Sequence, residues 1–179
     1  MAKGFTLVEL LIVICILAVL SAAVVVVLNP AALLAQSRDT TRISDLNSIH
    51  SALALYSVST TTVDMGDEAD SSSLLDGVNG DCNDALTAAG ETNRDVAGTG
   101  WIEVPLSHLS GGSPIPAYPI DPTNNADYHY CYNNEDDDDS WEISANLESA
   151  KYMTTEDLDG TDGGDQVNAY EVGTNLTRL

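Results

Sequence analysis

Residues 5–28 read FTLVELLIVICILAVLSAAVVVVL, and this stretch decides how the rest of the chain can be arranged. It contains a single charged residue, Glu9, among its 24 residues. At 1.5 Å per residue, a helix of this length measures about 36 Å, which spans the roughly 30 Å hydrocarbon core of a bilayer. The stretch is longer than the apolar region of a secretory signal peptide, so it predicts a membrane anchor that stays in place.

The charge is distributed very unevenly along the chain. Residues 1–62 hold three acidic and three basic residues, so the formal net charge of −22 falls on residues 63–179, where 25 carboxylates face three cations. A field of this sign repels phosphate and argues against nucleic-acid binding. Because Lys3 precedes the apolar stretch and the acidic part follows it, the positive-inside rule predicts a cytoplasmic N-terminus and an exported remainder.

Glu9 is the unusual residue of the apolar stretch. An ionised carboxylate there costs about 3 kcal/mol even on the lenient insertion scales. Because Glu9 lies close to the start of the chain, one explanation is that it reaches the headgroups. The other is that it pairs with a cation within the membrane. The helix itself offers no Lys or Arg nearby, so the partner would be an N-terminal amine or a group from another subunit.

Residues 3–14, KGFTLVELLIVI, resemble the leader and N-terminal helix of type IV prepilins and of the pseudopilins of type II secretion. The resemblance rests on a short basic leader, Gly4 before a scissile bond, Phe5 after it, and Glu9 five residues into the mature chain. It implies that a membrane prepilin peptidase cleaves between Gly4 and Phe5 and methylates the new amine of Phe5. It also implies that Glu9 of an incoming subunit pairs with its neighbour's Phe5 amine.

A second helical segment is expected after Asn29-Pro30, where proline can break or kink the helix. Apolar residues recur there at spacings of three and four, the pattern of an amphipathic helix that extends to about Val58. The members of this stripe are Ile43, Leu46, Ile49, Leu53 and Tyr56. The charged residues between Arg38 and Asp45 are predicted to form solvated surface pairs, each worth a few tenths of a kcal/mol. They are Arg38, Asp39, Arg42 and Asp45.

The exported part is predicted to form a small antiparallel sheet on this helix. Residues 128–132 and 141–147 alternate between apolar and polar residues, which predicts a hairpin, and a third strand is expected near 167–172. A short helix is expected at 81–89, whereas the four prolines of 111–122 exclude a central strand there. With the resemblance, these patterns predict an α+β pilin fold, in which a long N-terminal transmembrane and amphipathic helix packs on a small sheet.

The same patterns divide the chain into four parts. These are a leader (1–4), a transmembrane and filament-core helix (5–29), the amphipathic half of the spine helix (30–60) and an exported acidic head (61–179). The resemblance implies a homopolymer with minor pilins, built by prepilin peptidase and an inner-membrane assembly platform. Before assembly the chain would be a single-pass inner-membrane protein, and afterwards part of an extracytoplasmic filament.

Two further sites are expected in the head. Cys82 and Cys131 form an even pair in the exported part, where disulfides persist, and they are predicted to be bonded. Four carboxylates among glycines suit a hard cation such as Ca²⁺, although the spacing is not that of an EF-hand. These candidate ligands are Asp157, Asp159, Asp162 and Asp165. Major pseudopilins are known for calcium in a C-terminal loop, and a solvated acidic loop is the alternative.

Catalysis is not expected from the sequence. The three histidines, His50, His108 and His129, lack metal-ligand spacing, and the chain has no Gly-x-Ser-x-Gly motif. We therefore expect a structural subunit of a type IV pilus-like filament. Adhesion, motility and DNA uptake remain open as its role. The major pseudopilin of a type II secretion system is the first alternative, and an anchored extracytoplasmic enzyme or a monomeric calcium-binding adhesin represents another class.

Overall fold

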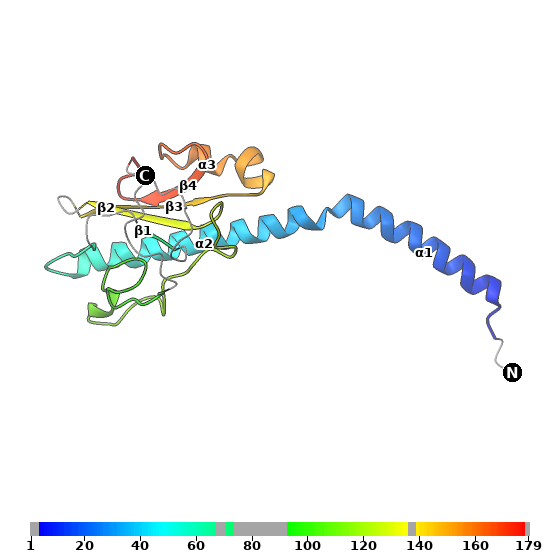
Figure 1. Ribbon diagram of the computed structural model, residues 1–179, viewed down its shortest axis with the longest axis horizontal. Helices are drawn as coiled ribbons and strands as arrows, with labels where there is room; N and C mark the ends of the chain where they lie inside the picture. The colour runs from blue at the N-terminus through cyan, green and yellow to red at the C-terminus, as the bar shows by residue number, and fades with distance from the viewer. Residues whose placement is uncertain (1–3, 67–70, 74–92, 136–138, 178–179) are drawn as a thin grey trace. The chain divides into compact units, whose positions relative to one another are not determined.

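The computed structural model describes residues 4–66, 71–73, 93–135 and 139–177, which fall into two units, Met1–Ala35 and Gln36–Leu179 (Figure 1). The first unit contains α1, Leu7–Leu28, and the first residues of α2, Pro30–Ser59. Between the helices, Asn29 adopts a left-handed conformation with φ of 39°. Pro30 suits the first position of a helix because that position needs no N–H donor. The predicted helix break is therefore confirmed.

The second unit is an α+β head built on α2. Its sheet has the order β1-β2-β3-β4, with every neighbouring pair antiparallel. The strands are β1 (Ser71–Ser72), β2 (Tyr130–Glu135), β3 (Ser140–Asn146) and β4 (Ala169–Gly173). In the β2–β3 hairpin Tyr130 pairs with Ala145, and β4 extends the sheet by pairing Val172 with Ile143. The hairpin and the strand after it are confirmed, and the sequence did not predict β1.

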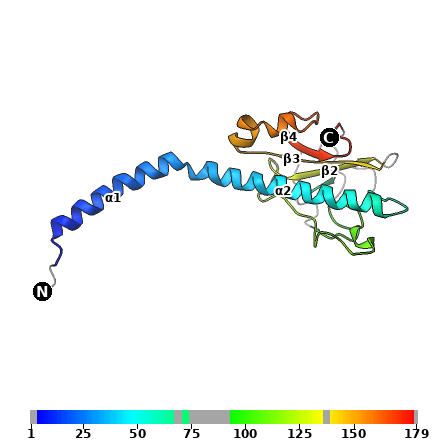
Figure 2. The same ribbon diagram turned by 180° about the vertical axis from the view of Figure 1, so that it is seen from behind.

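The sheet lies between α2 on one face and two short helical segments on the other (Figures 1 and 2). These segments are η2 (Lys151–Thr155) and α3 (Leu158–Thr161), and they connect β3 to β4. Residues 111–122 are irregular, as their prolines predict. The helix predicted at 81–89 lies outside the described residues.

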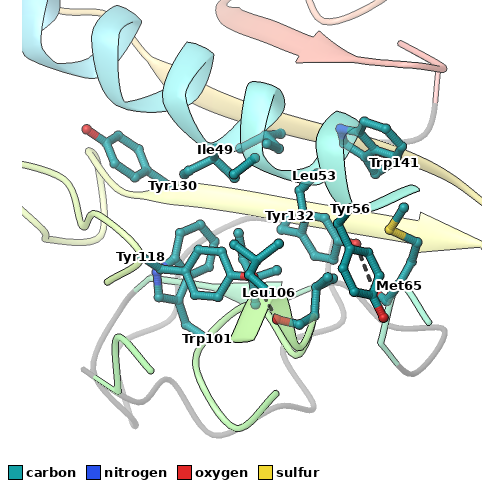
Figure 3. Packing of buried hydrophobic residues seen from close by; sticks show 14 of the residues in the cluster. Ile49, Leu53, Tyr56, Met65, Trp101, Leu106, Tyr118, Tyr130, Tyr132 and Trp141 are labelled. Carbon is teal, nitrogen blue, oxygen red and sulfur yellow. Dashed lines mark hydrogen bonds between the residues drawn. The ribbon is translucent and has the colours of Figure 1, made fainter. Parts of the chain in front are cut away.

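The core forms where α2, the sheet and the loop around η1 (Leu106–His108) meet. Figure 3 shows Ile49 and Leu53 of α2 close to Tyr130 and Tyr132, with further aromatic side chains from the loop. Buried tyrosines keep their hydroxyls bonded: Tyr132 donates to the Met65 carbonyl at 2.8 Å. Large aromatic side chains contribute much of the buried apolar area, and in this core they pack beside aliphatic residues such as Leu46 and Ile143.

Candidate functional site

The segment before α1 is exposed and has no regular secondary structure from Gly4 to Thr6. Phe5 is 87% exposed, and a Cβ atom built on Gly4 would meet no atom within 4 Å. The peptide bond between Gly4 and Phe5 is therefore accessible to a protease. Because packing among the described residues does not require glycine at position 4, a requirement for glycine would come from the enzyme that cleaves the bond.

Thr6 and Glu9 form a reciprocal capping box at the start of α1. Oε2 of Glu9 accepts hydrogen bonds from the backbone N–H and the hydroxyl of Thr6, both at 2.8 Å. In return the N–H of Glu9 donates to the Thr6 hydroxyl at 3.2 Å. These bonds pair N–H groups that the first helical turn leaves unpaired. Among the described residues Oε1 of Glu9 accepts no hydrogen bond, so it can accept one from another molecule.

The side chains of α1 are apolar and uncovered. The segment Leu7–Val25 has a mean hydropathy of 3.0, and none of it is buried. Its length and composition are sufficient to cross a bilayer. A helix of this kind requires lipid or other apolar helices around it, as expected of the membrane anchor that the sequence predicts.

Residues 1–25 match the family model of the prokaryotic N-terminal methylation motif. No curated protein and no solved structure matches the chain. The matched residues include the exposed Gly4-Phe5 bond, the glutamate in the first turn of α1 and most of its uncovered apolar helix. The motif is the signal of type IV pilins and pseudopilins, and the long helix with its antiparallel sheet is consistent with the pilin fold. The resemblance seen in the sequence is confirmed, while membership among major pseudopilins stays a prediction.

The head contains a second group of charged residues, which the sequence did not identify as a site. Arg42 is fully buried, and each of its five N–H donors has a partner. Nε and Nη2 donate to Asp121 at 2.6 and 3.1 Å, and Nη2 also donates to Thr123 at 3.2 Å. Nη1 donates to Asp39 at 2.8 Å and to Glu148 at 2.6 Å. The predicted solvated pairs are therefore wrong for Asp39 and Arg42, whose side chains have no exposure.

Other bonds extend this ionic cluster, which we define as Arg38, Asp39, Arg42, Asp121 and Glu148. Arg38 makes two parallel bonds to Glu148, at 2.6 and 2.7 Å. Asp39 accepts from the backbone N–H groups of Glu148 and Ser149, the latter at 2.8 Å. The ring of Tyr128 lies 4.8 Å from Cζ of Arg42. The cluster thus joins α2 to the end of β3 and to the loop before β2.

The two arginines favour the ionised form of Glu148. Hydrogen bonds from Arg38 and Arg42 outweigh the effect of burial and lower the pKa of Glu148 to about 2. Although burial disfavours the charge of Arg42, hydrogen bonds to Asp121 and Glu148 raise its pKa above the ordinary value. Two cations face three carboxylates here, and the fully buried Arg42 contacts all three of them.

The structure does not gather the four predicted calcium ligands around one point. Asp157 and Asp165 are exposed, whereas Asp162 uses both oxygens for backbone N–H groups, of Gly164 at 3.0 Å and of Glu171 at 2.7 Å. Within the described part of the chain, no three His, Cys, Asp or Glu side chains are placed to hold a metal. Asp159 is buried, and its Oδ1 has no hydrogen-bond partner. Among the four candidate ligands, all of which are described, this unpaired oxygen is the feature that favours a cation, and the calcium assignment stays a prediction.

Calcium would raise the thermal stability of the head by mass action, because the ion would bind the ordered acidic loop of the folded state and not the unfolded chain. We expect the melting temperature of the head without residues 1–29 to rise with Ca²⁺ and much less with Mg²⁺, which demands a tighter octahedron. Asp159→Asn should remove the shift, and Asp127→Asn, on another exposed loop, should retain it. Equal shifts from both ions would indicate charge screening, and no shift would leave a solvated loop.

One buried acidic residue near this loop was missed by the sequence analysis. Glu171 of β4 is 2% exposed and hydrogen-bonds to the side chain of Glu142 on β3. Burial and this neighbour raise the pKa of Glu171 to about 8. The alternation of apolar and polar residues along β3 predicts that Glu142 lies on the face of the sheet opposite α2. It does not predict that η2 and α3 cover that face.

The predicted disulfide involves a residue outside the described ones, Cys82. Cys131 is buried on β2. The loop of 48 residues between the two cysteines would stabilise the head by about 4 kcal/mol if closed. We expect alkylation of the folded protein without reduction to modify neither Cys82 nor Cys131, and labelling of both after unfolding and reduction serves as the control. Labelling of both without reduction would contradict the prediction.

The histidines lie in separate elements. His50 is on α2 beside the Trp141 ring, 5.8 Å between ring centroids, and His108 ends η1. His129 precedes β2, where its Nδ1 lies 3.2 Å from the Asn125 carbonyl. The pilin-type motif points to a structural protein rather than an enzyme.

Proposed function

We propose that this chain is the structural subunit of a type IV pilus-like filament, cut between Gly4 and Phe5 and polymerised through α1. The observation that carries the proposal is the methylation motif at residues 1–25 on an exposed, uncovered apolar helix. In a filament, the apolar surface of α1 would be covered by the same helices of neighbouring copies. The cytoplasmic position of the N-terminus before assembly belongs to this proposal and follows from the positive-inside rule.

One face of α2 supports packing between subunits. Its exposed positions at spacings of three and four carry small or uncharged side chains: Ser37, Thr41, Ser44, Ser48, Ser51, Leu55 and Val58. Several of the hydroxyls bond to carbonyls of their own helix, as Ser48 does to Ser44 at 2.7 Å. On a chain with a net charge of −22, such a face lets another subunit approach without burying charge.

Processing provides the direct test of the proposed function. We expect mature chains to begin at N-methylated Phe5 and to have lost Lys3, as measured by mass spectrometry of the N-terminal peptide from filaments. Gly4→Val should block cleavage without unfolding the chain, because a Cβ atom at position 4 has no neighbour within 4 Å. Recovery of intact Met1 from assembled filaments would contradict the proposal.

The major pseudopilin of a secretion system is the alternative within the same class. The acidic, glycine-containing segment 157–165 favours it, because this segment lies in a place comparable to the C-terminal loop for which major pseudopilins are known to hold calcium. A melting-temperature increase specific to Ca²⁺ would support that alternative. Filaments that assemble and remain stable in EDTA would support the pilus.

A further inference from the structure

The ionic cluster lies where α2 enters the head. The helix from Pro30 to Ser37 is exposed or half-buried. The cluster residues of α2 follow within its next two turns: Arg38, Asp39 and Arg42. A short helical segment with little buried surface is marginally stable in water, so pulling on α2 from its N-terminal side would unwind it as far as Arg38. The cluster is therefore the first part of the head to carry such a load.

The bonds of the cluster are directed across α2 to segments that are distant in sequence. Arg42 holds Asp121, 79 residues away, and Glu148, 106 residues away. Asp39 accepts a hydrogen bond from the backbone N–H of Ser149. The backbone that follows β3 is therefore bonded to α2, in addition to the side chain of Glu148. The guanidinium has no free N–H donor that could re-bond if the helix moved along its axis. Movement of α2 by a fraction of a turn would break several charge-assisted bonds at once.

The buried apolar contacts of α2 are of a different kind, although Thr40, Asp45 and Asn47 also hydrogen-bond to tyrosine hydroxyls of the head. Leu46, Ile49 and Leu53 are buried among apolar side chains. Apolar attraction is non-directional and roughly proportional to buried area, so it changes little over a small displacement. Charge-assisted hydrogen bonds weaken steeply when their angle or distance changes. Resistance to the first displacement along α2 should thus come from the ionic cluster rather than from the apolar core.

We propose that the ionic cluster is a mechanical clamp that stops α2 from unwinding or sliding out of the head when tension arrives along the helix from its N-terminal side. In a filament, tension between subunits would reach the head along this path, and that use of the clamp rests on the proposed function. The clamp itself is a property of the single chain and can be measured without a filament.

The test is to pull single full-length chains in detergent micelles with optical tweezers. One handle is attached at position 177 and the other at position 31, on α2 before the cluster. In a second geometry the other handle is at position 61, beyond the end of α2, so that the load does not reach the cluster first. Arg38→Met is the clamp variant, because its side chain is 37% exposed and its loss should not prevent folding. Leu53→Ala is the control that weakens the apolar core.

We expect Arg38→Met to lower the unfolding force in the position-31 geometry and to leave it near the wild-type value in the position-61 geometry. Leu53→Ala should lower the force in both geometries. Equal lowering by Arg38→Met in both geometries would overturn the proposal, because it would mean a general loss of stability. An unchanged force in the position-31 geometry would overturn it too. Failure of filament assembly would contradict the proposed function, but it would not change the unfolding force measured in either pulling geometry.

Discussion

Arg42→Met is expected to destabilise the head by about 3–5 kcal/mol, because removing one partner of a buried ion pair leaves uncompensated charge behind. Asp39 and Asp121 have fully buried side chains, and Glu148 is nearly buried. Methionine fills similar volume without a donor. The measurement is urea unfolding of the head without residues 1–29 at neutral pH, with comparison of midpoints at an unchanged slope.

The control for this prediction is Arg38→Met, which removes the more exposed arginine of the cluster. Its only hydrogen-bonded partner among the described residues is Glu148, which also binds Arg42, so the loss should be much smaller than for Arg42→Met. A double variant, Arg42→Met with Asp121→Leu, should recover part of the loss, since one orphaned carboxylate is removed. Equal losses for the two arginine variants would contradict the assigned role of burial.

The pH dependence of the same experiment follows from Glu148. Its pKa in the folded head is about 2, below the ordinary 4.5, so its pairing stabilises the head above pH 4.5 and is lost as the pH falls toward 2. The shift corresponds to at most about 3 kcal/mol. In Arg42→Met the orphaned carboxylates can take up protons instead. The gap between wild type and variant should therefore narrow below pH 5, and a gap that stays constant to pH 3 would contradict the electrostatic explanation.

The parts of the fold that the sequence predicted correctly depend on local patterns. The apolar run of α1, the break at Asn29-Pro30 and the alternation of the β2–β3 hairpin are each visible within a short window. Periodicity within such windows largely determines the element, because it decides which face can be buried. The methylation motif is local in the same way, so it was recognised from sequence alone, whereas cleavage between Gly4 and Phe5 stays a prediction.

The ionic cluster was missed because its partners are 79 and 106 residues from Arg42. A charge pattern at short spacing cannot distinguish a solvated pair from a buried one, since the covering loop comes from elsewhere. One local signal was available, however. Asp39 and Arg42 continue the three- and four-residue spacing of the buried stripe that includes Leu46 and Ile49. Charged residues in register with a core stripe indicate burial, and burial of charge requires partners.

The acidic loop was interpreted from composition, and composition does not give the direction of side chains. Asp162 accepts the backbone N–H of Glu171, nine residues away. Glycines allow such a loop to turn back on the sheet, but they do not determine which carboxylate points inward. The buried acidic pair Glu142 and Glu171 arises from strand pairing, which the sequence predicts only as a hairpin with a further strand.

Glu9→Ala is expected to leave membrane insertion intact or improved while incorporation into filaments falls by a factor of about thirty or more. Removing the carboxylate from the apolar helix avoids a cost of about 3 kcal/mol. Loss of one partner of a buried, hydrogen-bonded charge pair costs about 2–5 kcal/mol, and 2 kcal/mol corresponds to that factor. The measurement compares the membrane fraction with sheared filaments in cells that lack the wild-type chain.

Thr6→Val separates the two roles that Glu9 could have. Within the chain Glu9 completes the capping box with Thr6, and between chains it would pair with the Phe5 amine. Thr6→Val removes the capping hydroxyl but keeps the carboxylate, and it should cost about 1 kcal/mol of helix stability. Filaments should therefore form from Thr6→Val subunits far better than from Glu9→Ala subunits. Equal loss in both variants would assign Glu9 to the cap of its own helix and exclude the pair between subunits.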